Sequence, residues 1–185
     1  MNVIVISASP NETGLTAACA AAAVAGVRSA GGRAEEVRLN NLEVGMCQAC
    51  DDGWGTCRTD HTCQVHDGFQ ALHARVLDAD ALVLVSPVYW HEMSESAKAL
   101  TDRLRRCEAT RGAESGLYDK PIIAVAAAGG SGNGMIACLA SMERWIKHIR
   151  ARVYDVLPVN RWSREYKLVA IEAAVRTMVE EAAEE

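Results

Sequence analysis

The stretch that decides the fold is "ALVLVSPVYWHEMSESAKALTDRL", residues 81–104. It begins with an almost uninterrupted apolar run, which is typical of a strand buried on both faces of a parallel sheet. A short polar loop follows, and then a segment of helical character for which Ser94 or Ser96 is a candidate N-terminal cap. The stretch therefore predicts one strand–loop–helix unit of an α/β domain.

The same alternation of strand and helix repeats along the chain. Strands are expected at residues 3–7, 33–39, 81–87, 120–130 and 152–159, and helices at 17–32, 67–79, 93–108, 134–151 and 163–185. Such alternation predicts a parallel sheet with helices on both faces. The second strand is the most polar and is expected near an edge. With no internal repeat or linker, the 185 residues predict a single domain, residues 1–185.

Composition excludes several classes of protein. The net charge of −5 argues against nucleic acid as a partner, because phosphate binding needs a basic surface. No apolar run approaches the roughly 20 residues of a membrane helix, and the first residues lack the features of a signal peptide. We therefore expect a cytoplasmic protein without membrane contact, in which cysteines stay reduced.

Ligands of parallel α/β sheets bind beyond the carboxyl ends of the strands, so the loops after the first, third and fourth strands should share a site. The first loop, "SASPNETGLT" (residues 7–16), offers hydroxyls and an amide and leads into a helix N-terminus. Such a terminus favours an anion. The loop has no lysine and no G-x-G-x-x-G pattern, which favours a monophosphate over a triphosphate. The alternative is that these residues are ordinary helix caps.

The other two loops have different compositions. The second contains Tyr89 and Trp90 beside a proline, and these aromatics could wall a flat ring or serve as core or interface residues. The third, "AAAGGSGNGM" (residues 126–135), is rich in glycine, which lets backbone N–H groups approach a ligand. The alternative for this third loop is a flexible turn.

Together the three loops resemble those of the flavodoxin-like family of NAD(P)H-dependent FMN reductases, most specifically the branch that includes the iron–sulfur flavoproteins. The resemblance runs from Val3 to about Leu157. "SPVYWHEMSESAKALTDRL" is close to the family's S-P-V-Y followed by K-A-x-x-D-R-L, and "AGGSGNG" matches the loop after strand four. The first loop departs from G-S-P-R-x-x-G-N-T at Asn11, where arginine is usual, and at Leu15, where asparagine is usual.

The resemblance implies a flavodoxin-like three-layer sandwich with a five-stranded parallel sheet in the order 2-1-3-4-5. It also implies an FMN site. The residues assigned to it are Ser9, Asn11, Gly14, Leu15, Thr16, Pro87, Val88, Tyr89, Trp90, Gly129, Gly130, Ser131, Gly132 and Asn133. No side chain is assigned a catalytic role, because the flavin carries the chemistry. His91 is interpreted as a solvated loop histidine, and Lys98, Asp102 and Arg103 as structural residues.

The function implied is that of an FMN-dependent oxidoreductase that takes hydride from NAD(P)H. Its acceptor would be small: a quinone, a nitro or azo compound, a flavin or a metal ion. An alternative is an electron-transfer flavoprotein that passes electrons between protein partners, and a third is a binding module that lost its cofactor. Relatives commonly dimerise, so a homo-oligomer, dimer or tetramer, is expected.

A cysteine-rich insertion, residues about 43–67, separates the second strand from the next helix. Relatives in the iron–sulfur branch carry C-x2-C-x2-C-x4–7-C here. In this chain Cys47 and Cys50 keep the first spacing, whereas Cys57 and Cys63 follow after longer gaps. Three interpretations stay open: a four-cysteine metal site, most readily a [4Fe–4S] cluster, reduced thiols on a lid or interface, and a redox pair formed by the C-x-x-C cysteines.

The surroundings of these thiols give further expectations. Four aspartates of the insertion place negative charge around them, which argues against a strongly activated thiolate. The remaining cysteines, Cys19, Cys107 and Cys138, are expected to be buried apolar residues of helices. Trp54, between two glycines, is expected to pack on a partner subunit or over the flavin.

Overall fold

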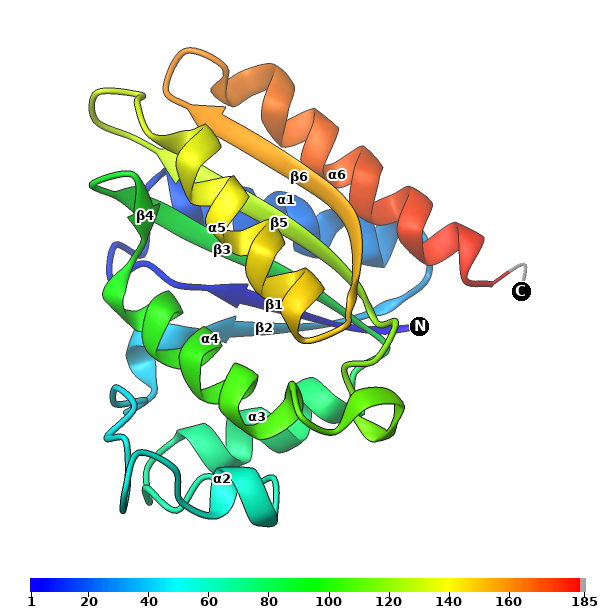
Figure 1. The fold of residues 1–185 in the computed structure, drawn as a ribbon. Helices are drawn as coiled ribbons and strands as arrows, with labels where there is room; N and C mark the ends of the chain where they lie inside the picture. The colour runs from blue at the N-terminus through cyan, green and yellow to red at the C-terminus, as the bar shows by residue number, and fades with distance from the viewer. Residues whose placement is uncertain (184–185) are drawn as a thin grey trace.

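The computed structural model describes residues 1–183. Its core is a parallel sheet in the order β2-β1-β3-β5-β6 (Figure 1). The bounds are β1 Asn2–Ser7, β2 Arg33–Arg38, β3 Ala81–Tyr89, β5 Pro121–Ala128 and β6 Arg152–Asn160. This order confirms the expected 2-1-3-4-5 arrangement and places polar β2 at an edge. The sequence did not predict β4, Glu92–Met93, a short strand that pairs antiparallel with the end of β3.

Helices cover both faces of the sheet. Their bounds are α1 Leu15–Ser29, α2 Thr56–Thr59, α3 Phe69–Asp78, α4 Glu95–Glu108, α5 Met135–His148 and α6 Arg164–Glu181, with 3₁₀ turns at Leu39–Asn41 and Gly112–Glu114. Helices α1 and α6 share one face, and α3, α4 and α5 share the other. The last two residues of the expected terminal helix, 184–185, lie outside the described residues. No helix of the described chain has the length and apolarity to cross a membrane.

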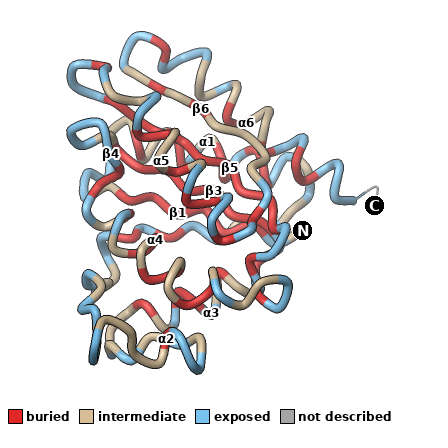
Figure 2. Tube along the Cα trace, in the orientation of Figure 1, coloured by how far each residue is buried: buried red, intermediate tan, exposed pale blue. Residues whose placement is uncertain are grey.

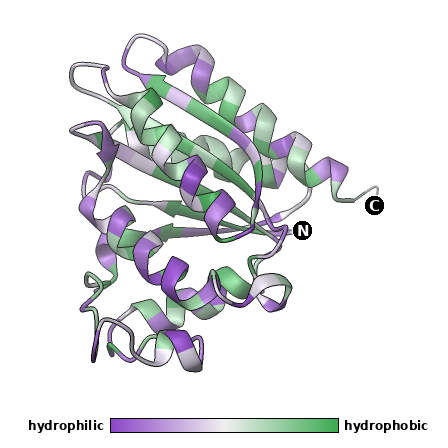
Figure 3. Ribbon diagram, in the orientation of Figure 1, coloured by the Kyte–Doolittle hydropathy of each residue, from purple (hydrophilic) through white to green (hydrophobic). Residues whose placement is uncertain are grey.

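The strands hold the layers together through alternating side chains. Val3 and Val5 pack with α1 and α6, whereas Ile4 and Ile6 pack with the helices of the opposite face, as successive residues of a strand must. Figure 2 shows β1, β3 and β5 as the most buried strands of the sheet, and Figure 3 shows their apolar character. Both sets of apolar side chains are removed from water, which is the main stabilising contribution to this fold.

Helices α1 and α6 approach each other closely at one glycine. A Cβ atom added at Gly26 would lie 2.5 Å from the carbonyl oxygen of Glu172 on α6. Such a distance would be a steric clash with the backbone of α6, so α1 requires glycine at position 26. The contact fixes α6, and with it the loop that leads from β6 into α6, relative to the sheet.

Candidate functional site

The first two loops are joined at the carboxyl edge of the sheet. The Ala8 amide donates to the carbonyl of Val85 over 2.9 Å. The Ser94 hydroxyl donates to the carbonyl of Ala8 over 2.8 Å, and the Ser94 amide donates to Ser86 Oγ over 3.0 Å. Ser94 Oγ also accepts from the Ala97 amide, which confirms it as the cap of α4. Buried serines therefore hold the ends of β1 and β3 together.

The third loop packs on the second. Gly134, which precedes α5, has φ of 82°, a left-handed conformation that favours glycine. A Cβ atom there would lie 2.9 Å from Cα of His91 and 3.1 Å from Cγ1 of Val88. The backbone of the glycine-rich loop thus lies directly against the aromatic loop. The structure brings all three predicted loops together at the carboxyl edge of the sheet.

The first loop ends at an open helix terminus. Ser9 Oγ accepts from the Asn11 amide over 3.2 Å, and Asn11 Oδ1 accepts from the Thr13 amide over 3.1 Å. Gly14 is the N-cap of α1, and no side chain caps the first turn. Its N–H groups are therefore available to an anion. Thr16 is buried in this first turn.

Two departures from the usual phosphate loop have structural consequences. The side chain of Leu15 packs against the apolar cluster of α1 and α6, so only its backbone N–H can serve a ligand. Asn11 brings no positive charge. Arg38, at the end of β2, reaches the loop from another strand and pairs with Glu12 over 3.2 Å. This cation is neutralised by its partner, so the loop relies on N–H and hydroxyl groups.

The two aromatic side chains of the second loop are exposed to solvent. Pro87 is buried and Val88 partly buried, whereas Tyr89 and Trp90 are exposed, Trp90 to 94%. Trp90 and His91 have φ of 48° and 72°. Positive φ angles are unfavourable for residues other than glycine, so these two consecutive residues store backbone strain. Such strain is found most often in loops that form functional sites. His91 is exposed, as its interpretation as a solvated loop residue requires.

Residues 129–133 of the third loop are exposed except at one position. Gly129, Gly130, Ser131 and Asn133 face solvent, and Gly132 is buried. A Cβ atom at Gly132 would lie 2.4 Å from the ring of Trp162. Trp162 belongs to the turn between β6 and α6, is 65% exposed, and has the Arg161 guanidinium 4.3 Å from its ring centroid.

Sequence reasoning missed Trp162. It considered the loops after three strands and did not include the loop after β6, which ends at the same edge of the sheet. The signal was present, because "NRWS" places an aromatic directly after the last strand in a chain with only 5% aromatic residues.

The cysteine-rich segment forms a second candidate site beside α4. A cavity of about 20 Å³ is lined by five cysteines: Cys47, Cys50, Cys57, Cys63 and Cys107. The segment was predicted as a loop, but Thr56–Thr59 forms the short helix α2. Figure 1 shows it next to α4, on the side away from α6. The structure thus brings all four predicted thiols to one cavity and adds a fifth from α4.

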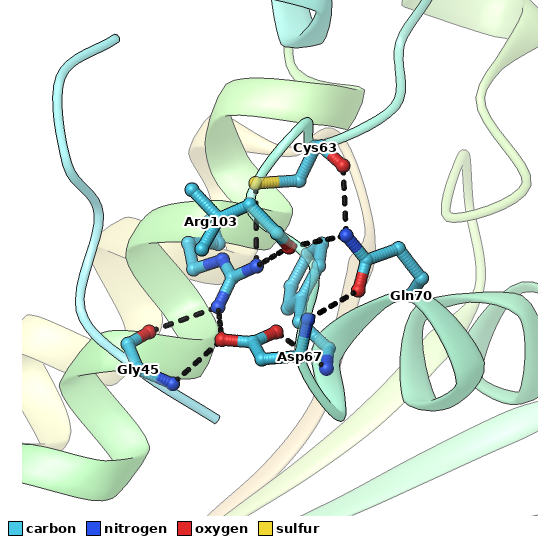
Figure 4. Close-up of polar contacts among 7 residues, drawn as sticks. Gly45, Cys63, Asp67, Gln70 and Arg103 are labelled. Carbon is cyan, nitrogen blue, oxygen red and sulfur yellow. Dashed lines mark hydrogen bonds and ion pairs between the residues drawn. The ribbon is translucent and has the colours of Figure 1, made fainter. Parts of the chain in front are cut away.

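Arg103 of α4 ties both ends of this segment together (Figure 4). Its Nη1 donates to the carbonyl of Gly45 over 3.0 Å and to Asp67 Oδ2 over 2.6 Å. Its Nη2 donates to the carbonyl of Val65 over 3.1 Å and to Cys63 Sγ over 3.3 Å. The prediction that Arg103 is structural understated its contacts with the cysteine segment.

Burial and hydrogen bonding set the charge states of Arg103 and Asp67. The Arg103 side chain is 1% exposed, and its guanidinium lies 4.2 Å from the ring centroid of Phe69. Burial alone would raise the pKa of Asp67, but hydrogen bonds from Arg103 and from the amides of Phe69 and Gly45 outweigh it and hold this pKa below its usual value. Asp67 is therefore ionised at neutral pH. One of the aspartates expected to surround the thiols is thus neutralised by a buried guanidinium.

Trp54 finds its partners within the chain. The guanidinium of Arg106 lies 3.9 Å from its ring centroid and that of Arg58 lies 5.5 Å away. Trp54 is also partly buried against the apolar cluster of α3, α4 and α5. These contacts partly bury Trp54 within the chain, and its packing on a partner subunit or over the flavin stays a prediction. The sequence did not indicate them, because Arg106 is distant along the chain.

The other cysteines divide into two kinds. Cys19, Cys107 and Cys138 are buried in helices, as predicted, and burial raises the pKa of each to about 12. Cys107 differs because it also lines the cavity. Over residues 1–183, no group of three or more histidine, cysteine, aspartate or glutamate side chains is placed to hold a metal ion. The thiols surround the cavity without converging on one point.

Lys98 and Asp102, interpreted from the sequence as structural residues, form an ion pair on α4. Lys98 Nζ lies 2.5 Å from Asp102 Oδ1, and both side chains are substantially exposed. Such a pair contributes only a few tenths of a kcal/mol. These residues therefore support the helix and do not form part of either candidate site.

The strand order and the three joined loops define a flavodoxin-like α/β protein. Solved structures share this fold: an NAD(P)H:quinone oxidoreductase from Methanothermobacter marburgensis has a TM-score of 0.72 at 18% identity, with 96% of each chain covered. An archaeal flavodoxin has a TM-score of 0.63 at 13% identity, over the whole of both chains.

Residues 1–159 match the NADPH-dependent FMN reductase family. The chain belongs to this family and is therefore an oxidoreductase of a class that uses FMN and NAD(P)H. It is also distantly homologous to iron–sulfur flavoproteins. That of Methanosarcina thermophila is 27% identical over 156 residues, 83% of this chain and 76% of the relative. That of Methanocaldococcus jannaschii is 30% identical over 57% of this chain, which spans about half (52%) of the relative.

Proposed function

We propose that this protein is an FMN-dependent oxidoreductase that takes hydride from NAD(P)H and reduces a small acceptor. The acceptor class is a quinone, a nitro or azo compound, a flavin or a metal ion. The observation that carries the proposal is the joining of three loops at the carboxyl edge of the sheet. Hydrogen bonds through Ser86 and Ser94 tie two of them, and Gly134 packs the third against them.

The groups of the three loops suit a flat, singly phosphorylated ligand. The uncapped first turn of α1, with the hydroxyls of Ser9 and Thr16, would hold the phosphate. Residues 87–90 would line the isoalloxazine ring, and backbone groups of residues 129–133 would bind its polar edge. FMN, when bound, supplies the chemistry of accepting hydride and passing electrons on. The chain's part is to bind, orient and partly shield the ring.

The test begins with flavin binding. FMN is titrated into the purified protein and its fluorescence is followed, and NADPH and NADH oxidation are then measured with a quinone, an azo dye and free flavin. We expect saturable FMN binding and steady NAD(P)H oxidation with at least one acceptor. Protein that stays free of flavin at saturating FMN would contradict the proposal and would support a binding module without cofactor.

A second candidate function rests on the cysteine cavity. Four loop thiols line one cavity next to two guanidinium groups. Thiolates are the ligands of iron–sulfur clusters, but within residues 1–183 no three such side chains are placed to hold a metal, so these thiols would have to move together to bind one. With such a group the protein would pass electrons between protein partners. FMN reduction by NAD(P)H without turnover of small acceptors, together with stoichiometric iron, would favour this function.

A homo-oligomer is also part of the proposal. Trp90 and Trp162 expose most of their surface next to the FMN loops, and Ile136 on α5 is 70% exposed. Exposed apolar side chains gathered at one edge are typical of an interaction surface. Sedimentation of the wild type and of Trp90→Ala tests this: we expect a dimer or tetramer that the variant weakens. A monomeric wild type would contradict it.

A further inference from the structure

Helices α4 and α5 lie on the same face of the sheet, with a groove of about 310 Å³ between them (Figure 1). Within the described chain, the lining of this groove shares no residue with the assigned FMN site or with the cysteine cavity. Small-molecule sites in proteins have volumes of roughly 300–1,000 Å³. The groove therefore has the size of a site for a small ligand.

The groove has apolar side chains in its lining and a fixed width. Met93 of β4 and Trp145 of α5 line it and are 6% and 7% exposed. The indole Nε1 of Trp145 donates to the carbonyl of Thr101 on α4 over 3.0 Å, and this hydrogen bond is buried. It ties α5 to α4 where both helices line the groove, so the fold itself sets the distance between them.

Positive charge lines the groove from both helices. Arg105 belongs to α4, and Arg144 and His148 belong to α5. Asp102, the one carboxylate of the described lining, pairs with Lys98 over 2.5 Å. Within residues 1–183, Arg105, Arg144 and His148 form no ion pair and no side-chain hydrogen bond. Three nitrogen-bearing side chains are thus left without an acceptor at one concave site.

The other cations of the two helices have partners. Arg103 pairs with Asp67, Lys147 pairs with Glu143, and the guanidinium of Arg106 lies over an aromatic ring. Such pairing is expected in a chain with a net charge of −5. Unpaired cations that line one groove of an acidic protein create a local positive potential, which attracts small anions.

The donors of the groove suit phosphate better than carboxylate. A guanidinium binds phosphate through two parallel N–H groups. Arg105 and Arg144, together with the imidazole of His148 and the hydroxyl of Ser141, offer more donors than the two oxygens of one carboxylate accept. A phosphate group has three acceptor oxygens, and a diphosphate has more.

We propose that the groove between α4 and α5 is a binding site for a phosphorylated small molecule of the nucleotide class, whose phosphates are held by Arg105 and Arg144. His148 and Ser141 are further donors to the same phosphates. Met93 and Trp145 offer apolar surface to the rest of the ligand. The phosphates could come from the nicotinamide donor or from a separate nucleotide, and the experiment distinguishes these two sources.

The experiment titrates the full chain with ADP by isothermal calorimetry, at low and at high salt. The variants are Arg105→Gln, Arg144→Gln and the double variant. Lys147→Gln is the matched control, because it removes the same charge from α5 at a side chain that pairs with Glu143 outside the groove. Circular dichroism and FMN titration check that each variant folds.

We expect the wild type to bind ADP saturably and more weakly at high salt, because salt screens charge. Each single variant should bind several-fold more weakly and the double variant at least about tenfold more weakly, since charge-assisted hydrogen bonds are lost. Lys147→Gln should bind as the wild type does. A wild type that does not bind ADP, or a double variant that binds it as tightly as Lys147→Gln, overturns the site.

Donor kinetics identify the source of the phosphates. If the groove holds the donor, the double variant raises the KM for NADPH or NADH with little change in kcat. If it holds a separate nucleotide, both KM values stay at the wild-type level while ADP binding is lost. ADP binding is measured without flavin or donor, so failure of this site and failure of the proposed oxidoreductase function are observed separately.

Discussion

Nη2 of Arg103 lies 3.3 Å from Sγ of Cys63, so a buried guanidinium on α4 donates directly to a thiol of the cysteine segment. The same side chain binds the carbonyls of Gly45 and Val65 and the carboxylate of Asp67. One residue thereby joins the beginning and the end of the insertion to a helix of the core. Trp54 and hydrogen bonds of Gln70 and His61 add further contacts between the segment and the core.

Arg103→Lys tests this anchoring role. Lysine keeps the charge but lacks the planar fork that reaches two carbonyls, a carboxylate and a sulfur at once. We expect a loss of about 2 kcal/mol in the free energy of unfolding, since hydrogen bonds to charged groups are lost. We also expect faster cleavage near Trp54 by chymotrypsin under native conditions. Arg105→Lys alters a neighbour on the same helix that forms no ion pair or hydrogen bond with the described residues 43–67, and it should change neither quantity.

Glu108, whose carboxylate is buried, is a second residue of α4 that stabilises the folded protein. Its Oε1 lies 2.8 Å from His73 Nε2 and its Oε2 accepts from Ser115 Oγ over 2.7 Å. Glu108→Gln removes the charge that these partners are placed to stabilise. We expect it to lower the free energy of unfolding by about 2 kcal/mol, measured by urea denaturation. Glu143→Gln, which disrupts the exposed pair with Lys147, should cost less than about 0.5 kcal/mol.

The same carboxylate predicts a pH dependence. Burial alone would raise the pKa of Glu108, but hydrogen bonds from His73 and Ser115 outweigh it and lower this pKa below the ordinary value of 4.5. A lowered folded pKa stabilises the protein fully above pH 4.5, and the stabilisation is lost as the pH falls through the folded pKa. The stability difference between wild type and Glu108→Gln should therefore shrink below pH 4.5. A difference that is constant from pH 7 to pH 3 would contradict this.

The contact between Gly132 and Trp162 predicts that the proposed FMN site is sensitive to a substitution at Gly132. Gly132→Ala adds a Cβ atom 2.4 Å from the Trp162 ring and requires alanine at φ of 72°. The Trp162 ring or the third loop must therefore move, and we expect FMN affinity to fall at least about tenfold, or roughly 1.4 kcal/mol. Gly129→Ala is the matched control, because a Cβ there meets nothing within 4 Å. Equal FMN affinities for the two variants would argue against a role of this loop in binding.

The sequence predicted the parallel sheet and the position of the three loops at its carboxyl edge. Apolar runs at β1, β3 and β5 indicate strands buried on both faces, and parallel topology then places their following loops at one edge. The serines that join those loops, Ser86 and Ser94, were quoted in the motif, but their hydrogen bonds depend on the pairing of β1 with β3. Periodicity identifies strands and helices and carries no information about such contacts.

The sequence by itself determined the α/β class, the strand order through its family motif, and the concentration of thiols in one insertion. These features follow from local patterns, in which neighbours along the chain share one element. Only the tertiary structure placed Arg103, Arg106 and Cys107 against that insertion and Trp162 over Gly132. These residues are separated from their partners by tens of positions, and side-chain packing between elements, which no local pattern encodes, brings them together.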